Sequence, residues 1–253
     1  MPANLNDLVA YLDLTLCPEM FRDYCPNGVQ IEGKQDVSKI VSGVTASQAL
    51  IDKAIDEKAD LLLVHHGFFW KGEDSCIRGM KKKRIKALLD HDISLLAYHL
   101  PLDAHPELGN NAQLAKLLGI TVTGGLEPDN PRSVGNVGTL DSSISTEEFS
   151  LRIESRLQRT PLAISGGNHP IRTVAWCTGG AQGYIDKAAA LGVDAYISGE
   201  VSEPTFHSAV ENGIHYFAAG HHATERYGVQ ALGENLALKF GIQHQYLEID
   251  NPV

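Results

Sequence analysis

The sequence predicts an α/β protein made of two similar halves with mostly parallel sheets. Short apolar runs alternate with amphipathic segments throughout the chain, which is typical of strands and helices packed in layers. Two stretches of the chain also repeat each other at a constant spacing, and histidines follow the ends of several expected strands. The first observation gives the fold class, the second gives the two halves, and the third indicates where a functional site lies.

The first half contains three expected strands and three expected helices. A buried strand runs into a turn at Ile40–Ser47, and the helical spacing of apolar residues begins directly after it. The run Leu61–Val64 is too short for a helix and suits a buried parallel strand that ends in His65-His66-Gly67. The other expected elements are a strand at Ile93–His99, a loop at Pro101–Pro106, and helices at Gln48–Lys58, Met80–Asp90 and Asn110–Leu118.

A segment rich in Gly, Pro, Asn and Ser, from Thr121 to Ser145, is the expected boundary between the halves. The predicted halves are residues 1–125 and 126–253. A second turn-rich patch, Ser165–Pro170, precedes a new series of strands and helices. The expected strands are Thr173–Thr178, Ala195–Ser198, His215–Ala219 and one near His244–Ile249, and the expected helices are Thr146–Gln158, Gln182–Leu191, Glu203–Asn212 and Thr224–Phe240.

The two halves resemble each other in sequence. Ile51-Asp52-Lys53-Ala54 recurs as Ile185-Asp186-Lys187-Ala188, at an offset of 134 residues. Further on, His99-x-x-x-Asp103 recurs as His221-x-x-x-Glu225, at an offset of 122. A duplication is one explanation, and chance similarity between strand–helix units is the other. A duplication predicts halves related by a pseudo-twofold axis, with the carboxyl ends of their strands facing one cleft.

Composition disfavours several classes of function. The chain has 253 residues, 43% of them hydrophobic, and the sequence shows neither a membrane span of roughly 18 apolar residues nor a signal peptide, so we expect a cytoplasmic protein. The four cysteines are scattered without a C-x-x-C pair, which disfavours a cysteine-based zinc site. The net charge of -10 disfavours general nucleic-acid binding, although a local basic patch remains compatible with it.

The histidines and carboxylates at the expected strand ends predict a metal site in the cleft between the halves. Imidazole and carboxylate are the usual ligands of zinc, iron and manganese, and this set is large enough for two divalent ions. A single histidine at a strand end more often caps a helix or lies in a hydrogen-bonded core. Because the set recurs in both halves, we favour metal binding over that interpretation. The candidates are His65, His66, His99, Asp103, His221 and Glu225.

Six motifs resemble those of the Nif-three-like family, whose members are often named GTP cyclohydrolase I type 2 homologues. They span nearly the whole chain and are YCPNGVQIEG (Tyr24–Gly33), SGVTAS (Ser42–Ser47), VHHGFFWKG (Val64–Gly72), YHLPLDAHPELGNNAQLA (Tyr98–Ala115), ISGE (Ile197–Glu200) and AAGHHATER (Ala218–Arg226). The similarity is greatest to the short bacterial form. The resemblance implies two similar α/β halves, a dinuclear metal site and a ring-shaped homohexamer. It assigns the metal ligands to His65, His66, Asp103, His221 and Glu225.

Two functions are compatible with these observations. The first is a metal-dependent hydrolase acting on a small nucleotide-like or phosphorylated substrate, with Glu200 and His99 as catalytic residues that move protons. Purine-ring opening of GTP is the reaction that the family name implies. The second is a non-catalytic metal-binding ring that engages DNA or a protein partner.

Four further features have alternative interpretations. The basic run Lys81–Lys86 either contacts phosphates or forms a solvated helix face. The aromatic residues Phe68–Trp70 either stack on a base or pack in a core or a subunit contact. Glu200 either serves the site or caps the following helix. Gly179-Gly180 matches a phosphate-binding loop only weakly, which favours a simple strand-to-helix turn.

Overall fold

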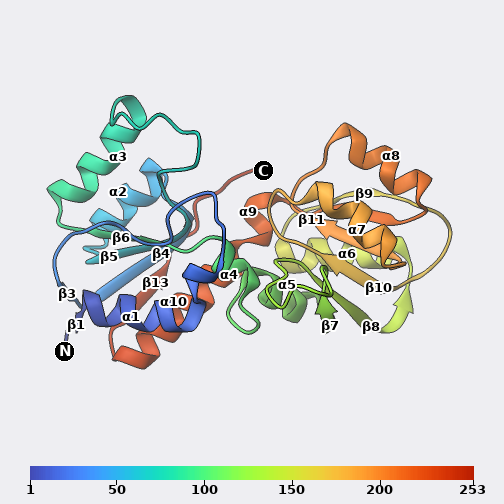
Figure 1. The fold of residues 1–253 in the computed structure, drawn as a ribbon, viewed down its shortest axis with the longest axis horizontal. Coiled ribbons are helices and arrows are strands. Elements are labelled where there is room, and N and C mark those ends of the chain that lie inside the picture. Colours follow the sequence, from blue (N-terminus) through green and yellow to red (C-terminus); the bar gives the residue numbers. More distant parts are fainter. The chain divides into compact units, whose positions relative to one another are not determined.

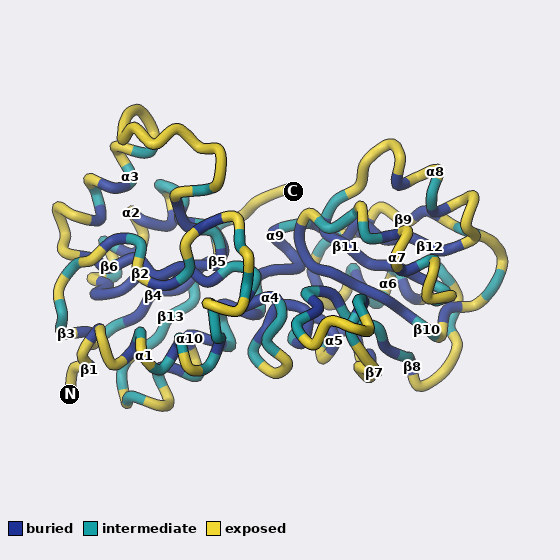
Figure 2. The backbone as a smooth tube through the Cα atoms, in the orientation of Figure 1, coloured by how far each residue is buried: buried dark blue, intermediate teal, exposed yellow.

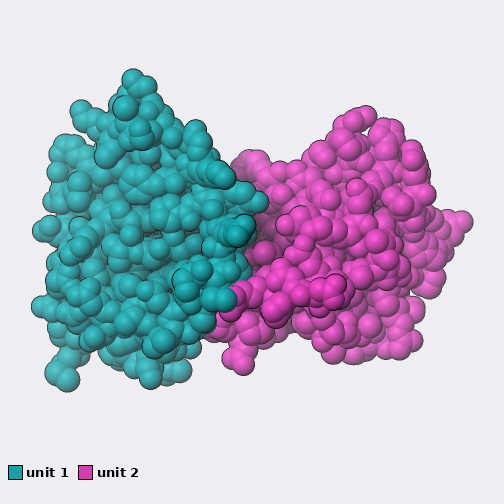
Figure 3. All heavy atoms as spheres, in the orientation of Figure 1, with its two compact units in different colours: residues 1–102, 228–250 teal, residues 103–227, 251–253 magenta.

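The computed structural model describes residues 1–253 and divides the chain into two compact units, each with its own sheet. Unit 1 comprises residues 1–102 and 228–250, and unit 2 comprises residues 103–227 and 251–253 (Figure 3). The bounds differ from the predicted halves, 1–125 and 126–253. The last strand, β13 (Gln243–Tyr246), pairs in parallel with β4 (Lys39–Thr45), which places it in unit 1.

Unit 1 is built on a five-stranded sheet with the order β13-β4-β5-β6-β2 (Figure 1). Its pairings are parallel except for β6 with β2, which is antiparallel. The remaining strands of the unit are β1 (Ala3–Asn4), β2 (Gly28–Ile31), β3 (Asp36–Val37), β5 (Leu61–His66) and β6 (Ser94–Ala97). The helices are α1 (Leu5–Leu16), η1 (Pro18–Met20), α2 (Gln48–Asp56), α3 (Gly79–Asp90) and α10 (Arg226–Phe240), which begins two residues before the unit resumes.

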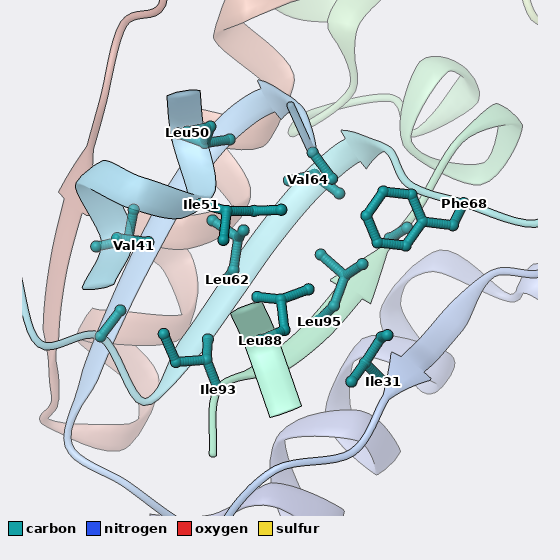
Figure 4. Packing of buried hydrophobic residues seen from close by; sticks show 14 of the residues in the cluster. Ile31, Val41, Leu50, Ile51, Leu62, Val64, Phe68, Leu88, Ile93 and Leu95 are labelled. Carbon is teal, nitrogen blue, oxygen red and sulfur yellow. The ribbon is translucent and has the colours of Figure 1, made fainter. Parts of the chain in front are cut away.

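Helices cover both faces of the sheet in unit 1, with α2 and α3 on one side and α1 and α10 on the other (Figure 1). Ile51 of α2 and Leu88 of α3 pack with Leu62 and Leu95 of the sheet in one apolar cluster (Figure 4). Full burial of such side chains stabilises the fold by roughly 1.5–3 kcal/mol each. None of the helices has the length and apolar character that crossing a membrane would require.

Unit 2 is built on a six-stranded sheet with the order β7-β8-β10-β11-β12-β9. Only the pairs β10/β11 and β11/β12 are parallel, and the other three pairings are antiparallel. The strands are β7 (Thr121–Gly125), β8 (Asn136–Ile144), β9 (Leu162–Ile164), β10 (Ile171–Trp176), β11 (Ala195–Ser198) and β12 (His215–Ala218). The α/β class is therefore confirmed, whereas the expectation of mostly parallel sheets is corrected to mixed sheets.

The helices of unit 2 also form two layers. Phe149 of α6 packs with Trp176 and Phe217 on one face of the sheet, and Ile185 of α7 packs with Tyr196 on the other. The central strands of both sheets are buried along most of their length (Figure 2). The helices are α4 (Leu100–Ala104), which begins in unit 1 and has only its last two residues in unit 2, α5 (Asn110–Leu118), α6 (Thr146–Leu157), η2 (Gln182–Tyr184), α7 (Ile185–Ala190), α8 (Glu203–Glu211) and α9 (His221–Thr224).

The expected boundary and the expected loop both contain regular structure. The boundary segment Thr121–Ser145 contains β7 and β8, because pairing of β7 with β8 and of β8 with β10 supplies the backbone hydrogen bonds that its composition does not predict. The expected loop Pro101–Pro106 overlaps the short helix α4, whose first turn tolerates Pro101. Both corrections concern elements that depend on pairing or packing more than on local sequence.

The internal repeat has a structural counterpart in two matching aspartate contacts, one in each unit. Oδ2 of Asp60 accepts hydrogen bonds from the backbone N–H groups of Ser38 at 2.7 Å and Lys39 at 3.0 Å. In unit 2, Oδ2 of Asp194 accepts from the N–H groups of Arg172 at 2.9 Å and Thr173 at 2.7 Å. Each residue of the first contact has its counterpart 134 positions later, which is the offset found in the sequence. This shared contact favours a duplication over chance similarity.

Candidate metal-binding groups

Three histidines of unit 1 form one cluster at the carboxyl ends of β5 and β6. The ring centroids of His65 and His66 are 4.5 Å apart, and that of His99 lies 5.0 Å from His65 and 5.8 Å from His66. One ring nitrogen from each lies within 4.8 Å of the others. The sequence-based expectation that the strand ends bring these residues together therefore holds within unit 1.

Gly67 lets the chain turn directly after the histidine pair. A Cβ atom at this position would lie 2.1 Å from Oε1 of Gln30 and 2.7 Å from the Cβ of Ala97, so only glycine fits. The same Gln30 oxygen accepts a hydrogen bond from the backbone N–H of Phe68 at 2.6 Å. The turn is thus fixed by contacts with β2 and β6.

The Nδ1 atoms of the histidine pair have partners within unit 1. Nδ1 of His65 donates to the carbonyl oxygen of Tyr98 at 2.9 Å, which leaves the lone pair on Nε2. Nδ1 of His66 is 3.1 Å from Oγ1 of Thr45, its neighbour across the β4–β5 pairing. Metal-binding histidines usually hold their second nitrogen in this way, which fixes the ring and directs the other nitrogen to the metal.

Asp23 is a functional candidate that sequence reasoning missed. Nδ1 of His99 donates to Oδ1 of Asp23 at 2.6 Å, and the backbone N–H of Tyr24 donates to the same oxygen at 2.6 Å. The other oxygen accepts from Nδ2 of Asn27 and the N–H of Leu100, both at 2.9 Å. Asp23 directly precedes the motif Tyr24–Gly33, but no spacing in the sequence connects it with His99, 76 residues away.

These bonds predict that Asp23 contributes to acid stability. Burial would raise its pKa, but the hydrogen bonds from His99 and Asn27 and the charge of His99 outweigh burial and lower the pKa to about 2 from 3.8. A depressed pKa gives stability that is present above 3.8 and is lost as the pH falls toward 2. Asp23→Asn is expected to lower the free energy of unfolding by about 2 kcal/mol at neutral pH.

The measurement is urea unfolding of chelator-treated wild type and Asp23→Asn at several pH values. The difference between the two proteins is expected to shrink as the pH falls from 3.8 to about 2. A difference that stays constant over this range would contradict the prediction.

The group formed by Asp23, Cys25 and His99 is close enough for a metal but does not suit one. Each carboxylate oxygen of Asp23 already accepts two hydrogen bonds from neighbouring groups. Burial and the nearby Asp23 charge raise the pKa of the Cys25 thiol to about 12, whereas metals bind the thiolate. Asp23 therefore positions His99 and does not itself act as a ligand.

Unit 2 brings together His221, Glu225 and Glu200. His221 begins α9 and Glu225 follows its last residue, and Nε2 of His221 lies 3.1 Å from Oε2 of Glu225. Nδ1 of His221 donates to Oε1 of Glu200 at 2.7 Å. Burial would lower the pKa of His221, but the hydrogen bonds and charges of Glu225 and Glu200 outweigh it and raise the pKa to about 9. Glu200 does not cap α8, the helix that follows it in the chain, because the N-cap of α8 is Ser202.

Asp103 and Glu225 form a buried pair of carboxylates. Asp103 is 5% exposed and Glu225 is 2% exposed, and a carboxylate oxygen of one lies within 4.8 Å of an oxygen of the other. Asp103 also accepts hydrogen bonds from Nδ2 of Asn110 at 2.8 Å and Oγ1 of Thr178 at 3.3 Å. Two buried like charges at this separation are costly unless a positive charge compensates them.

Gly179 provides the space that the Glu225 carboxylate occupies. Its φ is 70°, and a Cβ atom would lie 2.1 Å from Oε1 of Glu225 and 3.1 Å from Nε2 of His221. Two carboxylates and an imidazole are a suitable donor set for zinc, manganese or iron. The residues of unit 2 therefore fit a divalent cation by the chemistry of their donor atoms and by the burial of both carboxylates.

The basic run Lys81–Lys86 is partly neutralised by nearby acidic groups. Nζ of Lys81 lies 3.3 Å from Oε2 of Glu73 and 4.8 Å from the ring centroid of Phe69. Lys86 forms an ion pair with Asp90, four residues later on α3. These contacts favour a solvated helix face over a phosphate-binding surface.

The family model for Duf34/NIF3 (NGG1p interacting factor 3) matches residues 3–252. The chain belongs to this family. The resemblance seen in the sequence is thereby confirmed, and it covers nearly every residue.

The family's curated members and solved structures support the same assignment. A Pseudomonas aeruginosa protein named GTP cyclohydrolase 1 type 2 homolog is 58% identical over 252 residues, covering 100% of both chains. A Vibrio cholerae protein of the same name is also 58% identical and covers 99% of this chain and 100% of its own.

Two solved structures are similar over nearly the whole length of both chains. The protein ybgI, described as having unknown function, is 52% identical with a TM-score of 0.95, covering 99% of this chain and 100% of its own. The protein TTHA1606 from Thermus thermophilus is 34% identical with a TM-score of 0.90 and the same coverage. The mixed α/β architecture is therefore that of the family.

Proposed function

We propose that this protein is a metal-dependent hydrolase that holds two divalent ions through His65, His66, Asp103, His221 and Glu225. The observation that carries the proposal is the grouping of the buried carboxylates Asp103 and Glu225, with His221 beside Glu225, because carboxylate and imidazole are the usual ligands of divalent ions. The names of the relatives support a nucleotide-like substrate, and a phosphorylated small molecule is the broader class. The family resemblance also supports a homohexamer, which light scattering of the purified protein tests.

The chain's own residues would bind the ions and move protons. Bound divalent ions lower the pKa of a coordinated water and stabilise the charge that develops on substrate oxygens. The bond from His99 to Asp23 fixes the proton on Nδ1, so Nε2 of His99 accepts or releases the proton at the reacting group. Oε1 of Glu200 accepts from Nδ1 of His221 at 2.7 Å and Oε2 accepts from Nε2 of Gln182 at 3.3 Å. Because its side chain is also 36% exposed, Glu200 is the second proposed proton carrier.

Elemental analysis of the purified protein tests the metal site. We expect about two ions per chain in the wild type and a large loss in His66→Ala and Glu225→Ala, because each substitution removes a donor atom. His207→Ala is the matched control, since that exposed histidine pairs only with Glu203 on α8. Near-zero metal in folded wild type, even after incubation with zinc, manganese or iron, would refute the site.

Turnover by the metal-loaded protein tests the hydrolase. The substrates are nucleotides, phosphoesters and cyclic amides, and turnover that His66→Ala and Glu225→Ala abolish supports the proposal. Two bound ions with no turnover of any of these substrates would refute catalysis and leave the metal-binding scaffold as the function.

A further inference from the structure

Two partly exposed aromatic side chains border the histidine cluster of unit 1. The indole ring of Trp70 lies 5.0 Å from His99 at an interplanar angle of 84° and 5.8 Å from His66 at 58°. The ring of Tyr24 lies 6.4 Å from His99 at 66° and is 60% exposed. Both aromatic rings therefore reach the same imidazole while keeping surface open to solvent.

Hydrogen bonds hold the loops that carry both rings. The backbone N–H of Lys71 donates to the carbonyl oxygen of Tyr24 at 2.6 Å, which ties the two loops together. Nε1 of Trp70 donates to the carbonyl oxygen of Gly67 at 3.2 Å, which fixes the orientation of the indole. A rigid aromatic surface loses little conformational entropy when a ligand stacks on it.

The backbone of this segment is also strained. Phe69, between Phe68 and Trp70, has a φ of 65°, a conformation that is uncommon for a bulky residue other than glycine. The strained position sets Trp70 toward the histidines, while the ring of Phe69 faces Lys81. Strain of this kind gathers at ligand sites, where the surrounding contacts maintain it.

We propose that Trp70 and Tyr24 form a stacking subsite for the planar nitrogen heterocycle of a mononucleotide, beside His99. This proposal rests on the proposed function, because it names the part of the substrate that unit 1 recognises. Exposed indole and phenol rings bind planar π-systems by stacking, and purines offer the largest such surface in a nucleotide. A polynucleotide is disfavoured as the ligand, because the chain's net charge is -10 and Lys81 and Lys86 are already paired.

Tryptophan fluorescence of the metal-free full-length protein tests the subsite during titration with guanosine monophosphate. The chain has two tryptophans, and Trp176 is fully buried with its indole N–H bonded to the carbonyl oxygen of Asn111. We expect saturable quenching in the wild type that disappears in Trp70→Leu. Calorimetry is expected to show affinity at least about fivefold weaker in Tyr24→Leu. Phe206→Leu is the matched control, since that exposed aromatic residue lies on α8 beside His207, and it is expected to bind as the wild type does.

Three results would overturn the subsite. The first is ribose 5-phosphate binding as tightly as guanosine monophosphate, since that ligand has no base. The second is unchanged affinity in both Trp70→Leu and Tyr24→Leu. The third is a single-stranded oligonucleotide binding more tightly than the mononucleotide at moderate salt.

The metal content of Trp70→Leu separates this proposal from the proposed function. Wild-type metal content together with lost nucleotide binding supports the subsite, and loss of metal would show that Trp70 only supports the histidines. Nucleotide binding without turnover by the metal-loaded wild type would refute the hydrolase and leave the subsite standing.

Discussion

Gly179→Ala is expected to destabilise unit 2 by roughly 2–4 kcal/mol and to reduce metal binding sharply. The φ of 70° disfavours any residue with a Cβ atom, and that atom would overlap Oε1 of Glu225 at 2.1 Å. Glu225 has little room to withdraw, because its side chain is 3% exposed and contacts His221. The substitution therefore displaces a proposed metal ligand without changing its chemistry.

Urea unfolding and elemental analysis of Gly179→Ala measure both effects. Gly183→Ala is the matched control, since a Cβ atom there meets nothing within 4 Å and its φ is not positive. We expect the control to retain wild-type stability and metal content. Wild-type metal content in Gly179→Ala would show that the position of the Glu225 carboxylate does not matter for binding.

The sequence predicted correctly those helices and strands whose ends or burial are marked by neighbouring residues. The helix Asn110–Leu118 was predicted at its observed bounds, because Gly119 ends it in the left-handed conformation, with a φ of 68°. The strand Ala195–Ser198 was also predicted at its observed bounds, since a short buried apolar run suits a central parallel strand. The edge strand β7 was missed because all but one of its residues are exposed, so no alternation of apolar residues marks it.

The candidate site shows the same division between local and long-range information. His65, His66 and His99 were predicted to meet because each follows or ends a strand, and parallel strands end at one edge of a sheet. Asp23 lies in a loop before β2, and its contact with His99 depends on the antiparallel pairing of β2 with β6. No periodic pattern in the sequence predicts that β2 pairs with β6.

Glu200→Ala is expected to weaken binding of the ion held by His221 by about 10- to 100-fold. Glu200 accepts the Nδ1 proton of His221 at 2.7 Å and so holds Nε2, the nitrogen that a metal would take, beside Glu225. In Glu200→Gln the amide oxygen can still accept this bond, so we expect an intermediate affinity. Glu203→Ala is the matched control, because that carboxylate is exposed and bonds only with His207.

Competition with a chromophoric chelator at several pH values distinguishes orientation of His221 from a general structural effect. The neighbouring carboxylates raise the pKa of His221 to about 9, and a metal must displace that proton from the ring. Wild-type affinity is therefore expected to rise with pH until about 9. Removing Glu200 lowers the pKa of His221, so the rise of metal affinity with pH in Glu200→Ala should end at a lower pH. A uniform loss with an unchanged pH profile would show that Glu200 supports the fold and does not act through His221.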